Sequence, residues 1–127
     1  MNDDLIKHAI KMRENSYAPF SNYHVGAALK LKSGKIIGGC NVESSSYGLT
    51  CCAERVALYR AISEGYNDFI SLAIATENGG MPCGACRQII WELCENIPIH
   101  ICDLNGLIKT VYTEDLLPYA FDKKSLL

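Results

Sequence analysis

Three cysteines and one glutamate occur at spacings that could build a catalytic metal site. They come from two stretches, Thr-Cys-Cys-Ala-Glu-Arg at 50–55 and Pro-Cys-Gly-Ala-Cys-Arg-Gln at 82–88. Cys83 and Cys86 are three residues apart, a separation that puts both sulfurs on one face of a helix. Glu54 follows Cys52 by two residues, so on a helical turn their side chains point in different directions. If Cys52 binds the metal, Glu54 therefore faces the open coordination position, which is a catalytic arrangement.

A metal bound by these sulfurs needs its charge balanced. Both stretches are predicted to begin helices, and the positive end of a helix lowers the pKa of a thiol, so the cysteines should bind as thiolates. Three thiolates outweigh the two positive charges of Zn²⁺, which weakens the ion as a Lewis acid unless a cation offsets the excess. Arg55 and Arg87 each follow a motif residue directly and are the candidates. The alternative for each arginine is a side chain that faces water.

The two stretches follow the signature of zinc-dependent deaminases in its three-cysteine variant. In such enzymes three protein ligands leave one position for water, and the glutamate transfers protons instead of binding the metal. Three further segments extend the likeness, so that the chain resembles the small tetrameric cytidine deaminases of nucleoside salvage over nearly its whole length. They are Ala-Pro-Phe-Ser-Asn-Tyr-His-Val-Gly-Ala-Ala at 18–28, Gly-Cys-Asn-Val-Glu at 39–43 and Leu-Leu-Pro-Tyr-Ala-Phe at 116–121.

The resemblance implies an α/β fold of three layers, with a mixed five-stranded sheet and helices packed on it. It implies one Zn²⁺ per chain and hydrolytic deamination of cytidine and deoxycytidine to uridine and deoxyuridine. Glu54 would take a proton from water, deliver it to ring N3 and carry a second proton to the leaving amine. The metal ligands would be Cys52, Cys83 and Cys86.

The resemblance also implies how a nucleoside would be held. Asn41 and Glu43, on one face of an extended segment, would bind the sugar hydroxyls. Phe20 would pack on the base from its loop, where a binding role is favoured over core packing. The remaining implied roles are a backbone N–H to the base from Ala53, support around the metal from Gln88, and contributions across subunit interfaces of a homotetramer from Tyr47 and Phe121.

The elements before the site are predicted from periodicity and turn residues. Apolar residues at helical spacing after two aspartates predict a helix over 3–15. A loop with Pro19 follows at 17–22. Strands are expected at 24–31 and 35–39, joined by a hairpin at Ser33-Gly34.

The elements that carry and follow the site are predicted to alternate. Thr50 is expected to cap a helix that Gly65 ends, and Pro82 to open a second helix on which Cys86, Ile90, Leu93 and Cys94 share a face. The apolar run 69–76 predicts a buried strand between them. Further strands at 99–102 and 108–112 flank an Asn105-Gly106 turn. This order predicts parallel strands in the middle of the chain.

Composition limits the classes of protein. The 127 residues, 49% of them hydrophobic, predict a single domain over 1–127. A net charge of −2 without a basic run argues against nucleic acid as a partner. The sequence has neither the pattern of a secretory signal nor an apolar run that could span a membrane, so a cytoplasmic location is expected.

Three alternatives keep the metal but change the function or the substrate. A structural zinc module needs a fourth ligand, and no further cysteine or histidine has motif spacing to the three cysteines. Cys40, Cys94 and Cys102 fall in apolar segments and are expected to be small buried side chains, Cys51 a structural or partly exposed one, and His8, His24 and His100 ordinary core or surface residues. Deaminases that edit polynucleotides and deaminases that act on aminonucleoside antibiotics share the chemistry. The acidic net charge argues against a polynucleotide substrate. Cytidine is favoured over an antibiotic by the Pro19-Phe20 loop, Arg55 and the Asn41/Glu43 pair.

Overall fold

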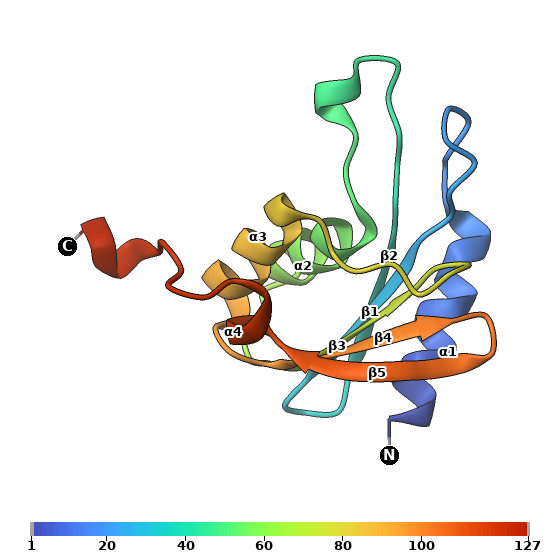
Figure 1. Cartoon of the computed structure of the whole chain (residues 1–127). Coiled ribbons are helices and arrows are strands. Elements are labelled where there is room, and N and C mark those ends of the chain that lie inside the picture. Colours follow the sequence, from blue (N-terminus) through green and yellow to red (C-terminus); the bar gives the residue numbers. More distant parts are fainter. Residues whose placement is uncertain (1, 127) are drawn as a thin grey trace.

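A five-stranded mixed sheet forms the centre of the molecule (Figure 1). The computed structural model describes residues 2–126. The strands lie side by side in the order β2-β1-β3-β4-β5. β1 is antiparallel to both neighbours, β3 and β4 are parallel, and β4 and β5 form an antiparallel pair. The strands are β1 (Gly26–Leu31), β2 (Ile36–Cys40), β3 (Phe69–Ala75), β4 (Pro98–Asp103) and β5 (Gly106–Tyr112). β2, β3 and β4 therefore run in one direction, as the alternating order predicts.

Helices cover both faces of the sheet, which confirms the predicted three-layer α/β fold (Figure 1). α1 (Asp3–Met12) lies on one face and packs small side chains, Ala9 against Ala28 and Ala73. α2 (Ala53–Ser63) and α3 (Gly84–Cys94) lie on the other, over a core of larger aliphatic residues. The short helices are η1 (Arg13–Asn15), η2 (Tyr47–Leu49), α4 (Thr113–Leu116) and η3 (Lys123–Leu126).

Close approach of helix to strand depends on a glycine in β2. A Cβ atom at Gly39 would lie 2.5 Å from the backbone nitrogen of Ala57 and 2.7 Å from the carbonyl oxygen of Ala53. Both atoms belong to the first part of α2. Gly39 therefore lets the beginning of α2 rest directly on the sheet.

Three predicted boundaries are wrong. Thr50 does not cap α2, because Cys51 pairs with Val42 in a β-bridge that keeps the chain extended until Cys52, the residue before the helix. Pro82 does not open α3, which begins at Gly84 after Cys83. The β4–β5 turn consists of residues 104 and 105, since Gly106 already pairs with Asp103 at the start of β5.

The other predicted elements are confirmed with small shifts. The helix predicted over 3–15 is α1 continued by η1, and the strands predicted at 24–31 and 35–39 are β1 and β2. Gly65, with φ +93°, follows the end of α2. Cys102 is fully buried as expected, whereas Cys40 and Cys94 are only partly buried. No helix within residues 2–126 is long and apolar enough to cross a membrane.

Candidate metal centre and active site

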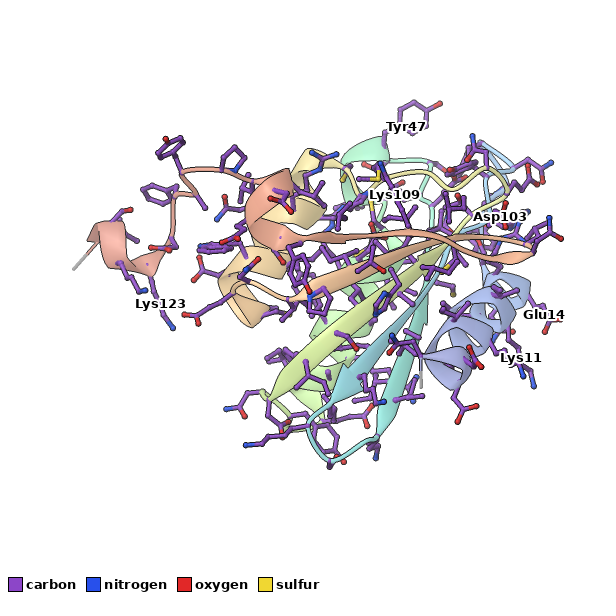
Figure 2. The ribbon with its side chains drawn as sticks, turned by 60° about the horizontal axis from the view of Figure 1, so that its bottom comes forward. Lys11, Glu14, Tyr47, Asp103, Lys109 and Lys123 are labelled. Carbon is purple, nitrogen blue, oxygen red and sulfur yellow. The ribbon has the colours of Figure 1, made fainter. Side chains whose placement is uncertain are left out.

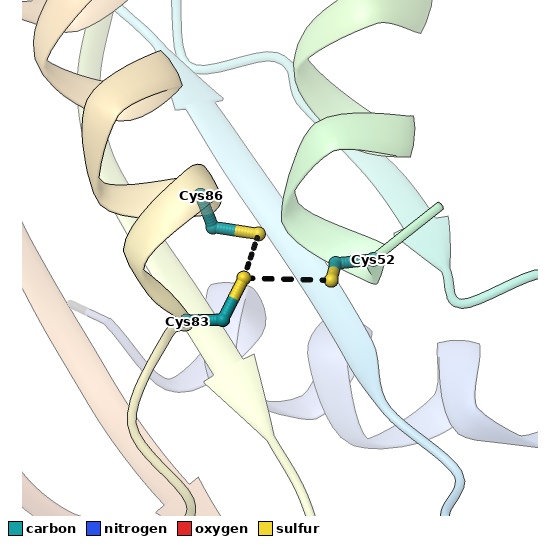
Figure 3. Close-up of side chains that lie close together, drawn as sticks. All are labelled: Cys52, Cys83 and Cys86. Atoms are coloured by element: carbon teal, nitrogen blue, oxygen red, sulfur yellow. Dashed lines mark hydrogen bonds between the residues drawn. The ribbon is translucent and has the colours of Figure 1, made fainter. Parts of the chain in front are cut away.

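The beginnings of α2 and α3 bring three cysteines together (Figure 3). Cys52 and Cys83 occupy the residue just before each helix, and Cys86 lies in the first turn of α3. The Cys52 and Cys83 sulfurs are 3.8 Å apart, the Cys83 and Cys86 sulfurs 3.5 Å, and all three lie within 4.8 Å of one another. The fold therefore brings the two motif stretches together, as the sequence predicts.

These sulfur positions fit a zinc ion. Zn–S bonds of about 2.3 Å in a tetrahedron place neighbouring sulfurs about 3.8 Å apart. Thiolates are also ligands that zinc favours. In the part of the chain that the structure describes, the group of potential ligands at this point comprises these three cysteines and no fourth. Three protein ligands are the arrangement of catalytic zinc sites, in which the fourth position is open to water or substrate.

Arg55 lies beside the cluster. Its Nη2 donates a hydrogen bond of 3.4 Å to the sulfur of Cys52. Hydrogen bonding with the Cys86 thiol, together with that from Arg55, lowers the pKa of Cys52 to about 5. The contact with Cys52, together with burial, raises the pKa of Cys86. Arg87 instead donates to backbone carbonyls, of Pro82 at 2.8 Å and of Leu116 at 3.2 Å. Of the two candidate arginines, Arg55 is the one beside a sulfur.

Glu54 lies in the first turn of α2 and is 4% exposed. Burial raises the pKa of its carboxyl to about 7. A carboxyl with a pKa near neutrality can both accept and donate protons, as general acid–base catalysis requires. Glu54 is thus suited to proton transfer at the cluster.

A cavity of about 470 Å³ opens beside the cluster. Its volume is in the range of sites for small molecules. Cys52, Cys83 and Glu54 line it together with Asn41 and Glu43, so five of the predicted site residues share one hollow. The other lining residues are Ser21, Tyr23, Val25, Thr50, Ile74, Thr76, Gly80 and Met81.

Asn41 is buried in the cavity wall and is nearly saturated with hydrogen bonds. Its Oδ1 accepts from the backbone N–H of Val25 at 2.9 Å and from the hydroxyl of Ser16. Its Nδ2 donates to the carbonyl of Tyr23 at 2.8 Å. An amide nitrogen carries two hydrogens. Asn41 therefore keeps one donor and no acceptor for a ligand.

Glu43 offers the opposite capacity. Its Oε1 accepts from the backbone N–H groups of Phe20 (2.9 Å) and Ser21 (3.1 Å), and its Oε2 accepts from the hydroxyl of Ser21. These bonds, that of the Ser21 hydroxyl above all, lower the pKa of the carboxyl. Because each carboxylate oxygen has two acceptor positions, Oε2 keeps one for a ligand.

Four of the predicted substrate-binding residues, Phe20, Tyr47, Ala53 and Phe121, lie outside the cavity lining. Phe20 and Tyr47 line a neighbouring hollow. Their rings meet edge to face, with the ring centroids 6.2 Å apart. Tyr47 is 79% exposed and points away from the molecule (Figure 2). Gln88 donates to the backbone carbonyl of Phe121 at 2.7 Å, and the C-terminal segment that carries Phe121 extends away from the sheet (Figure 1). Ala53 is buried at the first position of α2, where backbone N–H groups have no partner within the helix.

Sequence reasoning missed several lining residues, among them Tyr23, Thr76 and Met81. Tyr23 precedes β1, and the other two follow β3. They meet because β1 and β3 are antiparallel neighbours with Gly26 paired to Ala75, which joins the start of one strand to the end of the other. The hint available in the sequence was a cluster of small and polar residues at each of these strand ends.

The three-cysteine cluster that could hold a metal, the buried carboxyl and the adjacent cavity together have the features of an enzyme active site. Residues 1–100 match the family model described as the cytidine and deoxycytidylate deaminase zinc-binding region. The chain therefore belongs to the cytidine and deoxycytidylate deaminase family, and it is an enzyme of the hydrolase class.

Individual relatives agree with this membership. A cytidine deaminase of Halalkalibacterium halodurans is 46% identical over 125 residues, which cover 96% of this chain and 95% of that protein. The crystal structure of a cytidine deaminase from Burkholderia pseudomallei superimposes with a TM-score of 0.91 at 44% identity, over 95% of this chain and 99% of that one. A blasticidin-S deaminase of Bacillus cereus is 28% identical over 113 residues, covering 81% of this chain and 80% of that protein.

Proposed function

We propose that this protein catalyses the zinc-dependent hydrolysis of cytidine and deoxycytidine to uridine and deoxyuridine, with release of ammonia, in pyrimidine salvage. The observation that carries the proposal is the buried Glu54 carboxyl beside three clustered sulfurs at one cavity. The identity of 46% with a cytidine deaminase, against 28% with a blasticidin-S deaminase, supports the pyrimidine nucleoside as substrate.

Cys52, Cys83 and Cys86 would hold one Zn²⁺ per chain. The ion, when bound, supplies Lewis-acid activation of a water molecule at neutral pH. Arg55, through its hydrogen bond to Cys52, would offset the excess negative charge of the thiolates. Arg87 would hold the ligand loop in place through the carbonyl of Pro82, the residue before Cys83.

Glu54 would carry every proton of the reaction. It accepts a proton from the attacking water and delivers it to N3 of the base as the C–O bond forms at C4. It then passes the second proton of the water to the exocyclic amine, and the C4–N bond breaks to release ammonia. A pKa raised to about 7 by burial suits this carboxyl both to accept and to donate a proton.

Asn41 and Glu43 would bind one sugar hydroxyl as a complementary pair. The free Nδ2 hydrogen of Asn41 donates to the hydroxyl oxygen, and Oε2 of Glu43 accepts the hydroxyl proton. This division follows from the bonds that each side chain already makes. The N–H of Ala53 and the ring of Phe20 are proposed to contact the base, the latter from the rim of the cavity.

The proposed pair of Asn41 and Glu43 favours free nucleosides over cytosines in DNA or RNA. A 3′-oxygen esterified to phosphate has no proton to donate and brings a negative charge beside Glu43. Like charges in a partly dry pocket repel more strongly than in water. The net charge of −2 adds to this repulsion.

We further propose that residues 1–127 act as one domain in a cytoplasmic homotetramer. Exposed aromatic residues support the assembly: Tyr47 on the 44–50 loop, and Tyr119 and Phe121 on the C-terminal segment. In such an assembly Tyr47 and Phe121 would complete the site of a neighbouring subunit, and Gln88 would hold the Phe121 segment in place.

The experiment is release of ammonia from cytidine by the purified protein, with zinc measured on the same sample. A single-stranded oligonucleotide containing cytosine is the comparison substrate. Turnover of cytidine with one zinc per chain and negligible reaction on the oligonucleotide are expected. Comparable rates on both substrates, or no ammonia from cytidine at full zinc occupancy, would overturn the proposed function.

A further inference from the structure

A chain of hydrogen bonds joins two segments that wall the cavity. The Tyr23 hydroxyl donates to Oδ1 of Asn78 at 2.8 Å, and the Thr76 hydroxyl donates to the same oxygen at 3.3 Å. The Thr76 hydroxyl oxygen accepts from the backbone N–H of Gly80 at 2.7 Å. Tyr23 lies just before β1, whereas the other three residues follow β3. The bond between Tyr23 and Asn78 thus connects segments 55 residues apart in the sequence.

The segment after β3 leads directly to a cysteine of the cluster. Residues 76–82 contain no helix or strand, and Gly80 and Met81 line the cavity before Pro82 and Cys83. A segment without regular structure lacks the repeating backbone hydrogen bonds of a helix or strand, so a few individual contacts hold it in place. The Tyr23–Asn78 bond is therefore placed to fix both the cavity wall and the approach to Cys83.

Gly80 leaves the space that the Tyr23 hydroxyl occupies. A Cβ atom at Gly80 would lie 2.4 Å from that hydroxyl oxygen, with the next atom, the Thr76 Oγ1, at 3.6 Å. Gly80 is not among the residues with positive φ, so its backbone conformation does not itself require glycine. Crowding by the hydroxyl is therefore the main obstacle to a side chain at this position.

We propose that the Tyr23 hydroxyl is a positioning group which, through Asn78, holds the 76–82 segment in its substrate-binding position. We name the pair the Tyr23–Asn78 latch. The kinetic part of its test rests on the proposed function. Without the latch, the 76–82 segment samples more positions. Part of the substrate's binding free energy is then used to return the segment to its substrate-binding position, which weakens the apparent affinity for the substrate.

Tyr23→Phe tests the latch because it keeps the ring and removes only the hydroxyl. The KM for cytidine should rise about five-fold, the effect of one ordinary hydrogen bond, with kcat and zinc content nearly unchanged. Asn78→Ala should do the same, and Asn78→Asp, which keeps an acceptor oxygen, should restore most of the loss. Tyr112→Phe, at the end of β5, is the matched control and should leave KM unaltered. An unchanged KM in both Tyr23→Phe and Asn78→Ala would refute the latch.

Gly80→Ala provides an independent test of the same contact. Alone, it should raise KM because the new methyl group displaces the Tyr23 hydroxyl. Combined with Tyr23→Phe, which removes the crowded oxygen, it should raise KM less than the two single effects together. Strict additivity would mean that the hydroxyl and Gly80 do not meet, contrary to the proposal.

Failure of the proposed function is separable from failure of the latch. If the unmodified protein releases no ammonia from cytidine, the function is wrong, and the latch is judged by amide hydrogen exchange instead. Tyr23→Phe should then speed exchange at Gly80, whose N–H is bonded within the latched segment. Equal exchange rates in the two proteins would exclude the latch.

Discussion

Cys52 and Cys83 occupy helix N-cap positions without capping their helices. Residues there normally accept a hydrogen bond from the first turn, and loss of that bond costs roughly 1 kcal/mol. Neither cysteine makes a side-chain cap. Both sulfurs instead lie within 4.8 Å of each other and of the Cys86 sulfur. At the scale of single residues, these two positions thus forgo a cap hydrogen bond and place their thiols in the three-cysteine cluster.

Removal of one sulfur should release the metal. Cys83→Ala leaves two thiols, too few for a tight zinc site, so metal analysis should show loss of zinc with the fold retained. Cys51→Ala is the matched control: its neighbour is a proposed ligand, but Cys51 pairs with Val42 through its backbone and lies outside the cluster. It should keep full zinc. Full occupancy in Cys83→Ala would mean that the ligand set is wrong.

Spacing within each motif stretch, together with the resemblance to zinc deaminases, was sufficient to predict the cluster of Cys52, Cys83 and Cys86. Within each stretch, local helix geometry determines how the side chains are placed. Tyr23 and Met81 could not be found in this way. Their place in the cavity depends on which strands are neighbours in the sheet, and that is decided by packing across the whole core.

Among the elements, the contact of α2 with β2 is the one that positions Cys52 and Glu54. Gly39→Ala should place a methyl group against the backbone of Ala53 and Ala57 and push the helix start from the sheet. Overpacking of this kind costs about 1–3 kcal/mol, which a thermal or denaturant unfolding curve would measure. Gly48→Ala is the control, since open space surrounds Gly48. Equal stability of the two variants would contradict this account of the contact.

Most elements could be predicted because their signals are local. The apolar run of β3 and the helical periodicity of α1 are visible in the sequence. The start of α2 was misplaced because Thr50 has the chemistry of a cap. The β-bridge between Val42 and Cys51 overrides that preference. No local sequence pattern predicts this isolated bridge, because neither residue belongs to a regular strand.

At the scale of the whole molecule, exposed aromatic residues predict assembly. Tyr119 has no burial in the single chain, and Phe121 is 60% exposed on the same extended segment. Sedimentation equilibrium should give a mass near four times the 14.0 kDa of one chain. Phe121→Ala should shift the distribution toward smaller species, because it removes apolar contact area. A fully active species of 14.0 kDa would refute the tetramer.

The central claim, that Glu54 is the proton carrier beside a cysteine-bound zinc, is tested most directly by Glu54→Gln. The amide keeps the shape of the side chain and removes the titratable group, whereas Glu64→Gln makes the same change at an exposed pair with Arg60. The account predicts that Glu54→Gln retains one zinc and binds cytidine, while ammonia release falls by at least the roughly 10²- to 10⁴-fold typical of acid–base groups. Glu64→Gln should stay active. Near-normal ammonia release from a zinc-loaded Glu54→Gln protein would contradict the account.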